Sequence, residues 1–259
     1  MRRRNFVTAA TAALGVSAAD AAESTSKSQI FFLRWHYMRS GPQVDRTTKF
    51  LGSAYLPAVK RAGAKAMGFF TAVIADRSPF VLTLAAYPSL AAFESAESRL
   101  SADTELQKAA DDYDVIGDPA YIRIESALLR AFDAIPELTP PPVEPKHPSR
   151  IFELRTYESS NEKAARRKIK MFEDAEAGIF RRLGMRPVFF GRGLVGQNLP
   201  SLTYMLAYDD LAARDKLWKD FGSDPEWQKL RAQPGLSDAE IVSNISNQIL
   251  RPTPFSEIR

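Results

Sequence analysis

The sequence matches itself when it is shifted by 121 residues. Residues 30–130 align with residues 151–251 without a gap, and 23 of the 101 paired positions hold the same amino acid. The matching segments include Ile-Phe-x-Leu-Arg, Ala-Tyr-x-x-Leu and Asp-x-Glu-x-Gln-Lys, in the same order in both copies. A period of this length is that of a whole domain, whereas solenoid repeats have periods of about 20 to 50 residues. The chain is therefore predicted to contain two copies of one domain fold.

The first 21 residues have the pattern of an export signal rather than that of a folded element. Arg3 and Arg4 precede a weakly apolar run that ends in Ala-Asp-Ala, which is typical of a twin-arginine signal peptide. The apolar run is too short to span a bilayer. We therefore expect residues 1–21 to be removed on export to the periplasm of a bacterium, and residues 22–29 to form a disordered lead-in.

Charge and cysteine content limit the partners of the exported chain. Removal of Arg2, Arg3, Arg4 and Asp20 leaves 32 basic and 30 acidic side chains, so the formal net charge falls from +4 to +2. This balance argues against a nucleic-acid partner, and no later segment is apolar enough for insertion into a membrane. The absence of cysteine excludes disulfides, thiolate metal sites and cysteine nucleophiles.

A proline-rich segment separates the two copies. Residues 136–149 contain six prolines, and such a run favours extended polyproline geometry and acts as a semi-rigid spacer. The predicted domains are accordingly residues 30–135 and residues 150–259.

Each copy is predicted to contain the elements β-α-β-β-α-β. In the second copy, the hydrophobic pattern predicts strands from residue 151 and at 188–195, 202–208 and 242–250. The first helix ends at Gly184 and is expected to turn a basic face to water, made of Lys163, Arg166, Arg167, Lys168 and Lys170. The second helix follows Asp210 and is expected to bury Leu211, Leu217, Trp218 and Phe221. The first copy has the same elements, with a helix at 44–62 that ends on Gly63 and a last strand at 121–129.

This order of elements is that of the ferredoxin-like fold, in which two helices cover one face of the sheet. The other face is bare and must be buried against a partner. Because the chain holds two such sheets, we predict an α+β protein. Its two tandem ferredoxin-like domains pack sheet to sheet as an intramolecular dimeric α/β barrel.

Four segments of the second copy, in this order, resemble the NIPSNAP family. They are Phe-Glu-Leu-Arg-Thr-Tyr at 152–157, Tyr-Met-Leu-Ala-Tyr at 204–208, the Trp-Lys-Asp-Phe and Asp-Pro-Glu-Trp motifs at 218–227, and Leu-Arg-Pro-Thr-Pro-Phe-Ser at 250–256. The first copy is more divergent, with Phe32, His36 and Leu106 at the acidic, tyrosine and tryptophan positions. The resemblance implies the dimeric α/β-barrel superfamily, which hosts cofactor-free monooxygenases, haem enzymes, isomerases and binding proteins. The fold therefore does not select a reaction.

Alternation along the first strand of each copy sets one group of polar side chains apart. If the apolar residues face the helices, this group lines the barrel, and it consists of Arg34, His36, Glu153, Arg155 and Tyr157. Asn244, Ser246 and Gln248 share one face of the last strand, as Arg123 and Glu125 do in the first copy. Buried charges need partners. The group is therefore either an internal ion-pair network or a pocket in which arginines hold an anionic or carbonyl-bearing ligand.

His36 allows three interpretations. A single imidazole in a polar interior can be a haem axial ligand, a general base or a hydrogen-bonded structural histidine. The sequence contains no glycine-rich phosphate loop, no metal-spaced cluster and no serine-hydrolase elbow. We therefore assign no catalytic residue, no cofactor and no metal, and self-association is left open.

The predicted function is the binding of a small molecule in the barrel between the two copies. One alternative is a cofactor-free monooxygenase or isomerase that uses Arg34, His36, Glu153, Arg155 and Tyr157. The other is a structural or interaction protein with a closed barrel. A closed and fully paired interior favours the structural role, whereas an open mouth that leads to unpaired polar groups favours binding or catalysis.

Overall fold

A computed structural model describes residues 28–143 and 149–259. The predicted signal peptide, residues 22–27 of the lead-in and residues 144–148 of the linker lie outside the described residues. The elements of the first half are β1 (Ile30–Tyr37), α1 (Pro42–Phe50), η1 (Leu51–Tyr55), α2 (Leu56–Arg61), β2 (Met67–Ile74), β3 (Phe80–Tyr87), α3 (Leu90–Ala102), α4 (Thr104–Tyr113) and β4 (Arg123–Ala131). Those of the second half are β5 (Ile151–Glu158), α5 (Glu162–Met171), η2 (Phe172–Glu176), α6 (Ala177–Arg182), β6 (Arg186–Val195), β7 (Ser201–Tyr208), α7 (Leu211–Ser223), α8 (Pro225–Arg231), α9 (Asp238–Ile241) and β8 (Asn244–Pro252).

Local sequence signals account for the helix boundaries. The side chains of Ser89 and Asp210 accept hydrogen bonds from backbone amides in the first turns of α3 and α7, where the free N–H groups have no partner within the helix. Gly63 and Gly184 follow the first helix of each half with φ of 102° and 87°, a conformation that glycine adopts without a steric penalty. One predicted contact is wrong: Leu211 at the start of α7 is 41% exposed.

The first long helix of each half contains one π-helical turn, η1 in the first half and η2 in the second. The two turns lie 121 residues apart, the same spacing as between β1 and β5 and between β3 and β7. The residues before and after each turn are helical, so the helix predicted at 44–62 is one continuous helix with an insertion of this kind. Such turns accommodate an extra residue within a helix and often occur at functional sites.

The eight strands form a closed barrel in the order β1-β3-β2-β8-β5-β7-β6-β4, and every neighbouring pair is antiparallel. Each half contributes one four-stranded sheet, and the sheets join where β2 pairs with β8 and β4 pairs with β6. The predicted α+β fold, two tandem ferredoxin-like domains combined in one barrel, is confirmed. The strands β4 and β8 begin and end two residues later than predicted, and their final residues pair with strands of the other half.

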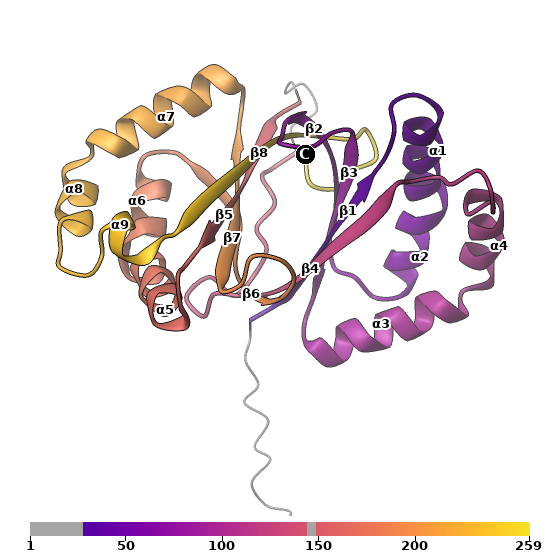
Figure 1. Cartoon of the computed structure of the whole chain (residues 1–259), viewed down its shortest axis with the longest axis horizontal. Coiled ribbons are helices and arrows are strands. Elements are labelled where there is room, and N and C mark those ends of the chain that lie inside the picture. The colour runs from indigo at the N-terminus through magenta and orange to yellow at the C-terminus, as the bar shows by residue number, and fades with distance from the viewer. Residues whose placement is uncertain (1–27, 144–148) are drawn as a thin grey trace, which may run out of the picture.

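Helices cover the barrel on two opposite sides, those of the first half on one side and those of the second half on the other (Figure 1). The apolar core is correspondingly divided into three clusters. One fills the barrel and contains residues of both halves, such as Phe31, Leu33, Phe152 and Leu154. The other two lie between each sheet and its own helices. No helix among the described residues is long and apolar enough to cross a membrane.

The two ends of the barrel differ. At the end where β1 and β5 begin, Leu138 of the linker and Ile258 near the carboxyl terminus pack into the barrel cluster. The backbone N–H of Leu138 donates to the side chain of Gln29, which directly precedes β1. Ile258 is fully buried, and these two segments close this end. The opposite end, where β1 and β5 finish, is the one that opens to solvent through a cavity.

Candidate functional site

The five candidate residues do not line the barrel. The residues of β1 and β5 that point into it are the apolar series that includes Phe31, Leu33, Phe152 and Leu154. The predicted orientation of the two faces is therefore wrong, and the candidate residues point toward the helices of their own half: Arg34, His36, Glu153, Arg155 and Tyr157. For Glu153 the reason is that helix α7 supplies polar partners, whereas the barrel centre is packed with apolar side chains.

Glu153 is fully buried and hydrogen-bonded to side chains of α7. Arg214 donates from Nη2 to Oε1 at 2.6 Å and from Nε to Oε2 at 3.2 Å, and the indole N–H of Trp218 donates to Oε2 at 2.7 Å. Arg155 adds a bond from Nη1 to Oε1 at 2.9 Å. Burial by itself would raise the pKa of Glu153, but the hydrogen bonds of Arg214 and the charge of Arg155 outweigh it and lower this pKa.

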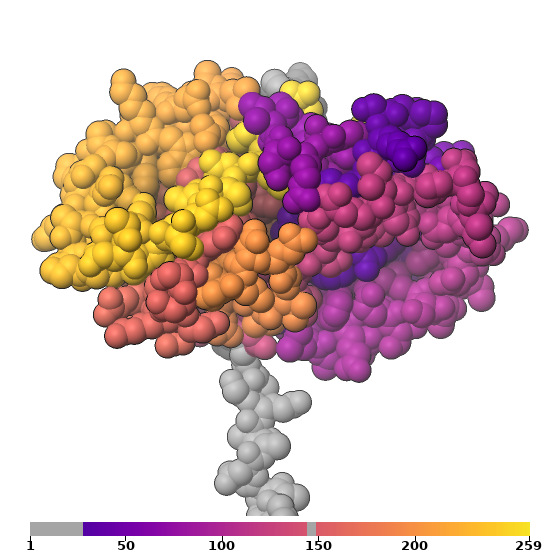
Figure 2. Space-filling model, viewed as in Figure 1, coloured from indigo at the N-terminus to yellow at the C-terminus, as the bar shows by residue number. Residues whose placement is uncertain are grey.

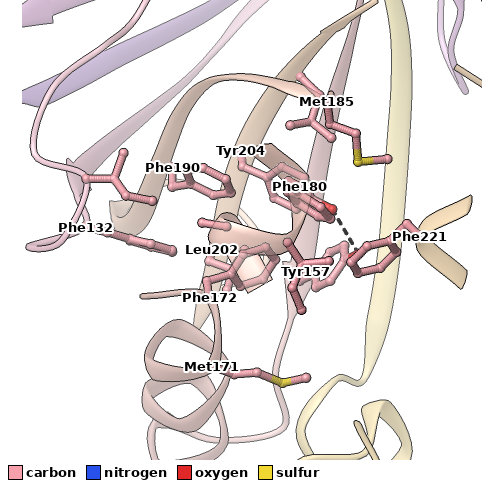
Figure 3. Close-up of a cluster of buried hydrophobic side chains, with 14 of the residues drawn as sticks. Phe132, Tyr157, Met171, Phe172, Phe180, Met185, Phe190, Leu202, Tyr204 and Phe221 are labelled. Atoms are coloured by element: carbon pink, nitrogen blue, oxygen red, sulfur yellow. Dashed lines mark hydrogen bonds between the residues drawn. The ribbon is translucent and has the colours of Figure 1, made fainter. Parts of the chain in front are cut away.

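Tyr157 joins this cluster to the aromatic core of the second half. Its hydroxyl accepts hydrogen bonds from Nη2 of Arg155 at 3.2 Å and from the hydroxyl of Tyr204 at 3.0 Å. Figure 3 shows Tyr157 and Tyr204 among the rings of Phe172 and Phe180. Burial raises the pKa of Tyr157. The cluster as a whole has the internal pairing that a structural network requires.

Lys168 was expected to face water, and this prediction is wrong. The residue is fully buried, and Nζ donates to Glu176 at 3.1 Å and to Asp238 at 3.3 Å. Burial alone would lower the pKa of Lys168, but the two carboxylates raise it. Hydrophobic periodicity missed this residue because it treats lysine as a surface residue, while Glu176 in η2 provides a charge partner inside the core.

In the first half, His36 is buried but unpaired. It is 5% exposed, and neither ring nitrogen has a hydrogen-bond partner among the described residues. Its ring lies at right angles to that of Tyr121, with the centroids 6.5 Å apart. Burial, assisted by the charge of Arg34, lowers the pKa of His36 to about 3, so the imidazole is neutral at physiological pH. Among the described residues, His36 is therefore not the hydrogen-bonded structural histidine of the third interpretation.

The open end of the barrel contains a cavity of about 460 Å³. Both halves line it, through the last residues of β1 and β5, the first residues of β4 and β8, and the β6–β7 hairpin. In Figure 2 a hollow lies where the yellow strand β8 and the orange β6–β7 hairpin meet the purple and magenta segments of the first half. Cavities of 300 to 1,000 Å³ are of the size that holds small organic ligands.

Hydrogen bonds fix several side chains of the cavity wall. The indole N–H of Trp35 donates to the amide oxygen of Gln248 at 3.0 Å and thus connects the first half with the second. The hydroxyls of Thr156 and Thr203 lie 3.0 Å apart. These residues continue the inward-facing series of their strands, which is apolar near the closed end and polar near the open end. This change from apolar to polar residues along the inward-facing side of each strand is the sequence signal that could have located the cavity.

Of the polar residues predicted to share one face of the last strands, all but Arg123 line the cavity. Gln248 and Ser246 of β8 and Glu125 of β4 line the cavity. Asn244 also lines it and donates from Nδ2 to Glu158 at 2.8 Å. Among residues 28–143 and 149–259, no group of three or more metal-ligating side chains is placed to hold a metal ion.

The second half of the chain is similar to a known protein family. Residues 152–257 match the profile of the NIPSNAP family. No curated protein sequence matches the chain at a significant level. An uncharacterised NIPSNAP-like domain protein from Burkholderia xenovorans is 25% identical, over 42% of this chain and 89% of that one, with a TM-score of 0.38.

Two solved structures are similar along most of the chain. A proposed monooxygenase from Fusobacterium nucleatum subsp. nucleatum ATCC 25586 has a TM-score of 0.56 at 12% identity, with 87% of this chain and 92% of that chain covered. A proposed monooxygenase from Lactobacillus acidophilus NCFM has a TM-score of 0.55 at 9% identity, with 87% and 94% covered. At such identities the likeness shows the fold alone. The chain thus shares an α/β-barrel fold with these proteins, and its residues 152–257 are similar to the NIPSNAP family.

Proposed function

We propose that this protein binds a small polar molecule in the cavity at the open end of its barrel. The observation that carries the proposal is the contrast between the two ends of one barrel. The closed end is packed with apolar side chains, including Ile258, whereas the open end is lined by polar side chains around about 460 Å³ of space. Polar groups in an interior are unfavourable unless they form hydrogen bonds. A barrel with a purely structural role has no need of such a wall.

The geometry favours binding over the oxygenase or isomerase alternative. That alternative relied on Arg34, His36, Glu153, Arg155 and Tyr157 as a cluster inside the barrel, and none of these side chains lines the cavity. Glu153 and Arg155 are instead paired with each other at the helix interface of the second half. The site is therefore assigned to ligand recognition, with no reaction attached to it.

Trp35 provides an internal reporter for the test. The experiment screens a chemically diverse set of neutral, acidic and basic small molecules for thermal stabilisation of the full chain. Each stabilising compound is then titrated while tryptophan emission is followed in the wild type and in Trp35→Phe. We expect at least one compound to change the emission of the wild type and not that of the variant. Binding that leaves Trp35 emission unchanged, or no stabilising compound at all, would contradict the proposal.

A further inference from the structure

We infer that the ligand of the cavity is neutral and polyhydroxylated, that is, a mono- or disaccharide or a related polyol. This inference rests on the binding function proposed above and narrows it to one chemical class. Three properties of the cavity wall carry it: the balance of its charges, the kind of its polar groups, and the position of its aromatic ring.

The charged side chains at the rim compensate one another. Arg77 pairs with Asp76 and with Glu125, both at 3.3 Å, and Arg123 pairs with Glu125 at 2.7 Å. The remaining charged residue of the wall is Glu158, which forms no ion pair with any described residue and accepts a hydrogen bond from Asn244. No uncompensated cation is therefore present in the described wall. A phosphate or carboxylate ligand would have to be desolvated beside Glu158 without a countercharge, which is unfavourable.

The other polar groups of the wall are amides and hydroxyls. Five primary amides, among them Asn247 and Gln248, and five aliphatic hydroxyls, among them Thr156 and Thr203, line the cavity. Amides and hydroxyls each donate and accept hydrogen bonds, as the hydroxyl groups of a polyol do. An ammonium ligand has donors only, so it would satisfy Glu158 but would leave the amide N–H groups without acceptors. The wall as a whole therefore matches a polyol better than an amine.

Trp35 supplies an apolar surface in this polar wall. Its indole N–H is fixed by Gln248 at 3.0 Å, and Ala127 and Leu129 also line the cavity. A sugar ring has polar edges and apolar C–H faces, so it can stack on an indole while its hydroxyls reach the amides. Tryptophan combines an apolar body with a polar N–H, which suits this kind of mixed contact.

Matched sugars that share a ring and differ in charge test the chemical class. Glucose, glucuronate and glucosamine form one such set, and galactose and its charged counterparts form a second. Xylose, maltose, cellobiose, trehalose and inositol extend the neutral group. Binding to the full chain is measured by calorimetry and by ligand-observed NMR up to about 50 mM. We expect at least one neutral compound to bind about tenfold more tightly than its charged counterparts. The carboxylate of glucuronate lacks a countercharge in the wall, and the ammonium of glucosamine replaces a hydroxyl that both donates and accepts with a group that only donates.

Variants then locate the binding. Glu158→Gln and Gln248→Leu should weaken the binding of the neutral compound by about fivefold or more. The first replaces a charged acceptor with a weaker neutral one, and the second removes an amide that also holds Trp35 in place. Glu94→Gln, which removes an exposed carboxylate on α3, should leave it unchanged. Melting temperatures of all variants establish that they are folded.

The outcomes separate this inference from the binding function. Tighter binding of glucuronate or glucosamine than of glucose, or no binding by any neutral compound, overturns the saccharide class. The binding function itself still stands in that case if another compound changes Trp35 emission. If no compound of any class does so, the binding function fails as well.

Discussion

Arg214 holds Glu153 through two hydrogen bonds, and 121 residues earlier the same two positions are occupied by Phe93 and Phe32, whose ring centroids lie 5.0 Å apart. An ion pair in one half thus corresponds to an aromatic pair in the other. The two positions differ between the halves as a pair, and there is a physical reason for this. Either residue of the ion pair without the other would leave a buried charge uncompensated. In the first half Arg34 lies over the ring of Phe32 at 5.1 Å, where Arg155 binds Glu153 in the second.

The first prediction transplants the aromatic pair into the second half. Glu153→Phe alone leaves Arg155 and Arg214 without their carboxylate and should reduce the free energy of unfolding by about 3–5 kcal/mol. The double variant Glu153→Phe with Arg214→Phe should lose less than the sum of the two single variants. Urea denaturation measures all three, and Lys216→Ala on the exposed side of α7 is the control. Losses that add to within about 0.5 kcal/mol would show that the two positions are not coupled.

A second prediction concerns Lys168 and Glu176. Burial is the main cause of the raised pKa of Glu176, and Lys168 opposes that rise. Lys168→Met should raise this pKa further, so that the folded state takes up a proton that the unfolded state releases. A group whose pKa is higher in the folded state than in the unfolded state contributes less to the free energy of unfolding as the pH rises. The loss of stability should therefore be larger at pH 8 than at pH 5.

Urea denaturation at the two pH values measures this difference. The double variant Lys168→Met with Glu176→Gln removes the titrating group and should show no such dependence. An equal loss at pH 5 and pH 8 for the single variant would contradict the assignment of Glu176 as the responsible carboxyl.

The third prediction follows from the low pKa of His36, about 3 in the folded state against 6.5 for the free side chain. Between these values the unfolded chain binds a proton that the folded chain does not. The contribution of neutral His36 to the free energy of unfolding is thus fully present above pH 6.5. It is lost as the pH falls, by up to about 1.4 kcal/mol per pH unit. His36→Leu should remove this contribution to acid sensitivity. The imidazole resonances of His36, observed in a His147→Gln background, should not shift between pH 5 and pH 8, and a midpoint within that range would refute the assignment.

A fourth prediction tests the intramolecular barrel. A fragment of residues 149–259 exposes the apolar inner face of its sheet, including Phe152 and Leu154, and leaves the edge strands β6 and β8 unpaired. Unpaired edges and apolar faces promote association. The fragment should dimerise or aggregate, as measured by light scattering during size-exclusion chromatography. A monomer that stays soluble at high concentration would show that the second half does not need the first.

The fifth prediction concerns cellular location. We propose that residues 1–21 direct export of the folded chain through the twin-arginine pathway of a bacterium. Replacement of Arg3 and Arg4 by lysine should retain the precursor in the cytoplasm, because this pathway requires the arginine pair. Cell fractionation with antibody detection measures the distribution, and replacement of Lys27 by arginine serves as the control. Normal export of the double variant would refute the twin-arginine assignment.

The element order, most element boundaries and the barrel could be predicted from the amino-acid sequence, because these depend on periodicity, capping residues and the match between the halves. The first helices end at Gly63 and Gly184 as predicted, and the second helix of the second half follows Asp210, which caps it. Glu125 and Gln248 were also grouped correctly, since polar side chains recur at every second residue in the first part of β8 and at the start of β4.

The face of β1 and β5 that lines the barrel could not be predicted from the sequence, because it depends on contacts that form in the folded chain. Alternation divides a strand into two faces, but both faces are buried in this protein, so polarity alone does not identify the inner one. Arg214 and Trp218 of α7 hold Glu153 on the helix side, and Glu176 does the same for Lys168. These partners lie at least eight residues away in the sequence, and Arg214 is 61 residues from Glu153. A buried charge is tolerated where such a partner contacts it, and that contact forms only in the folded chain.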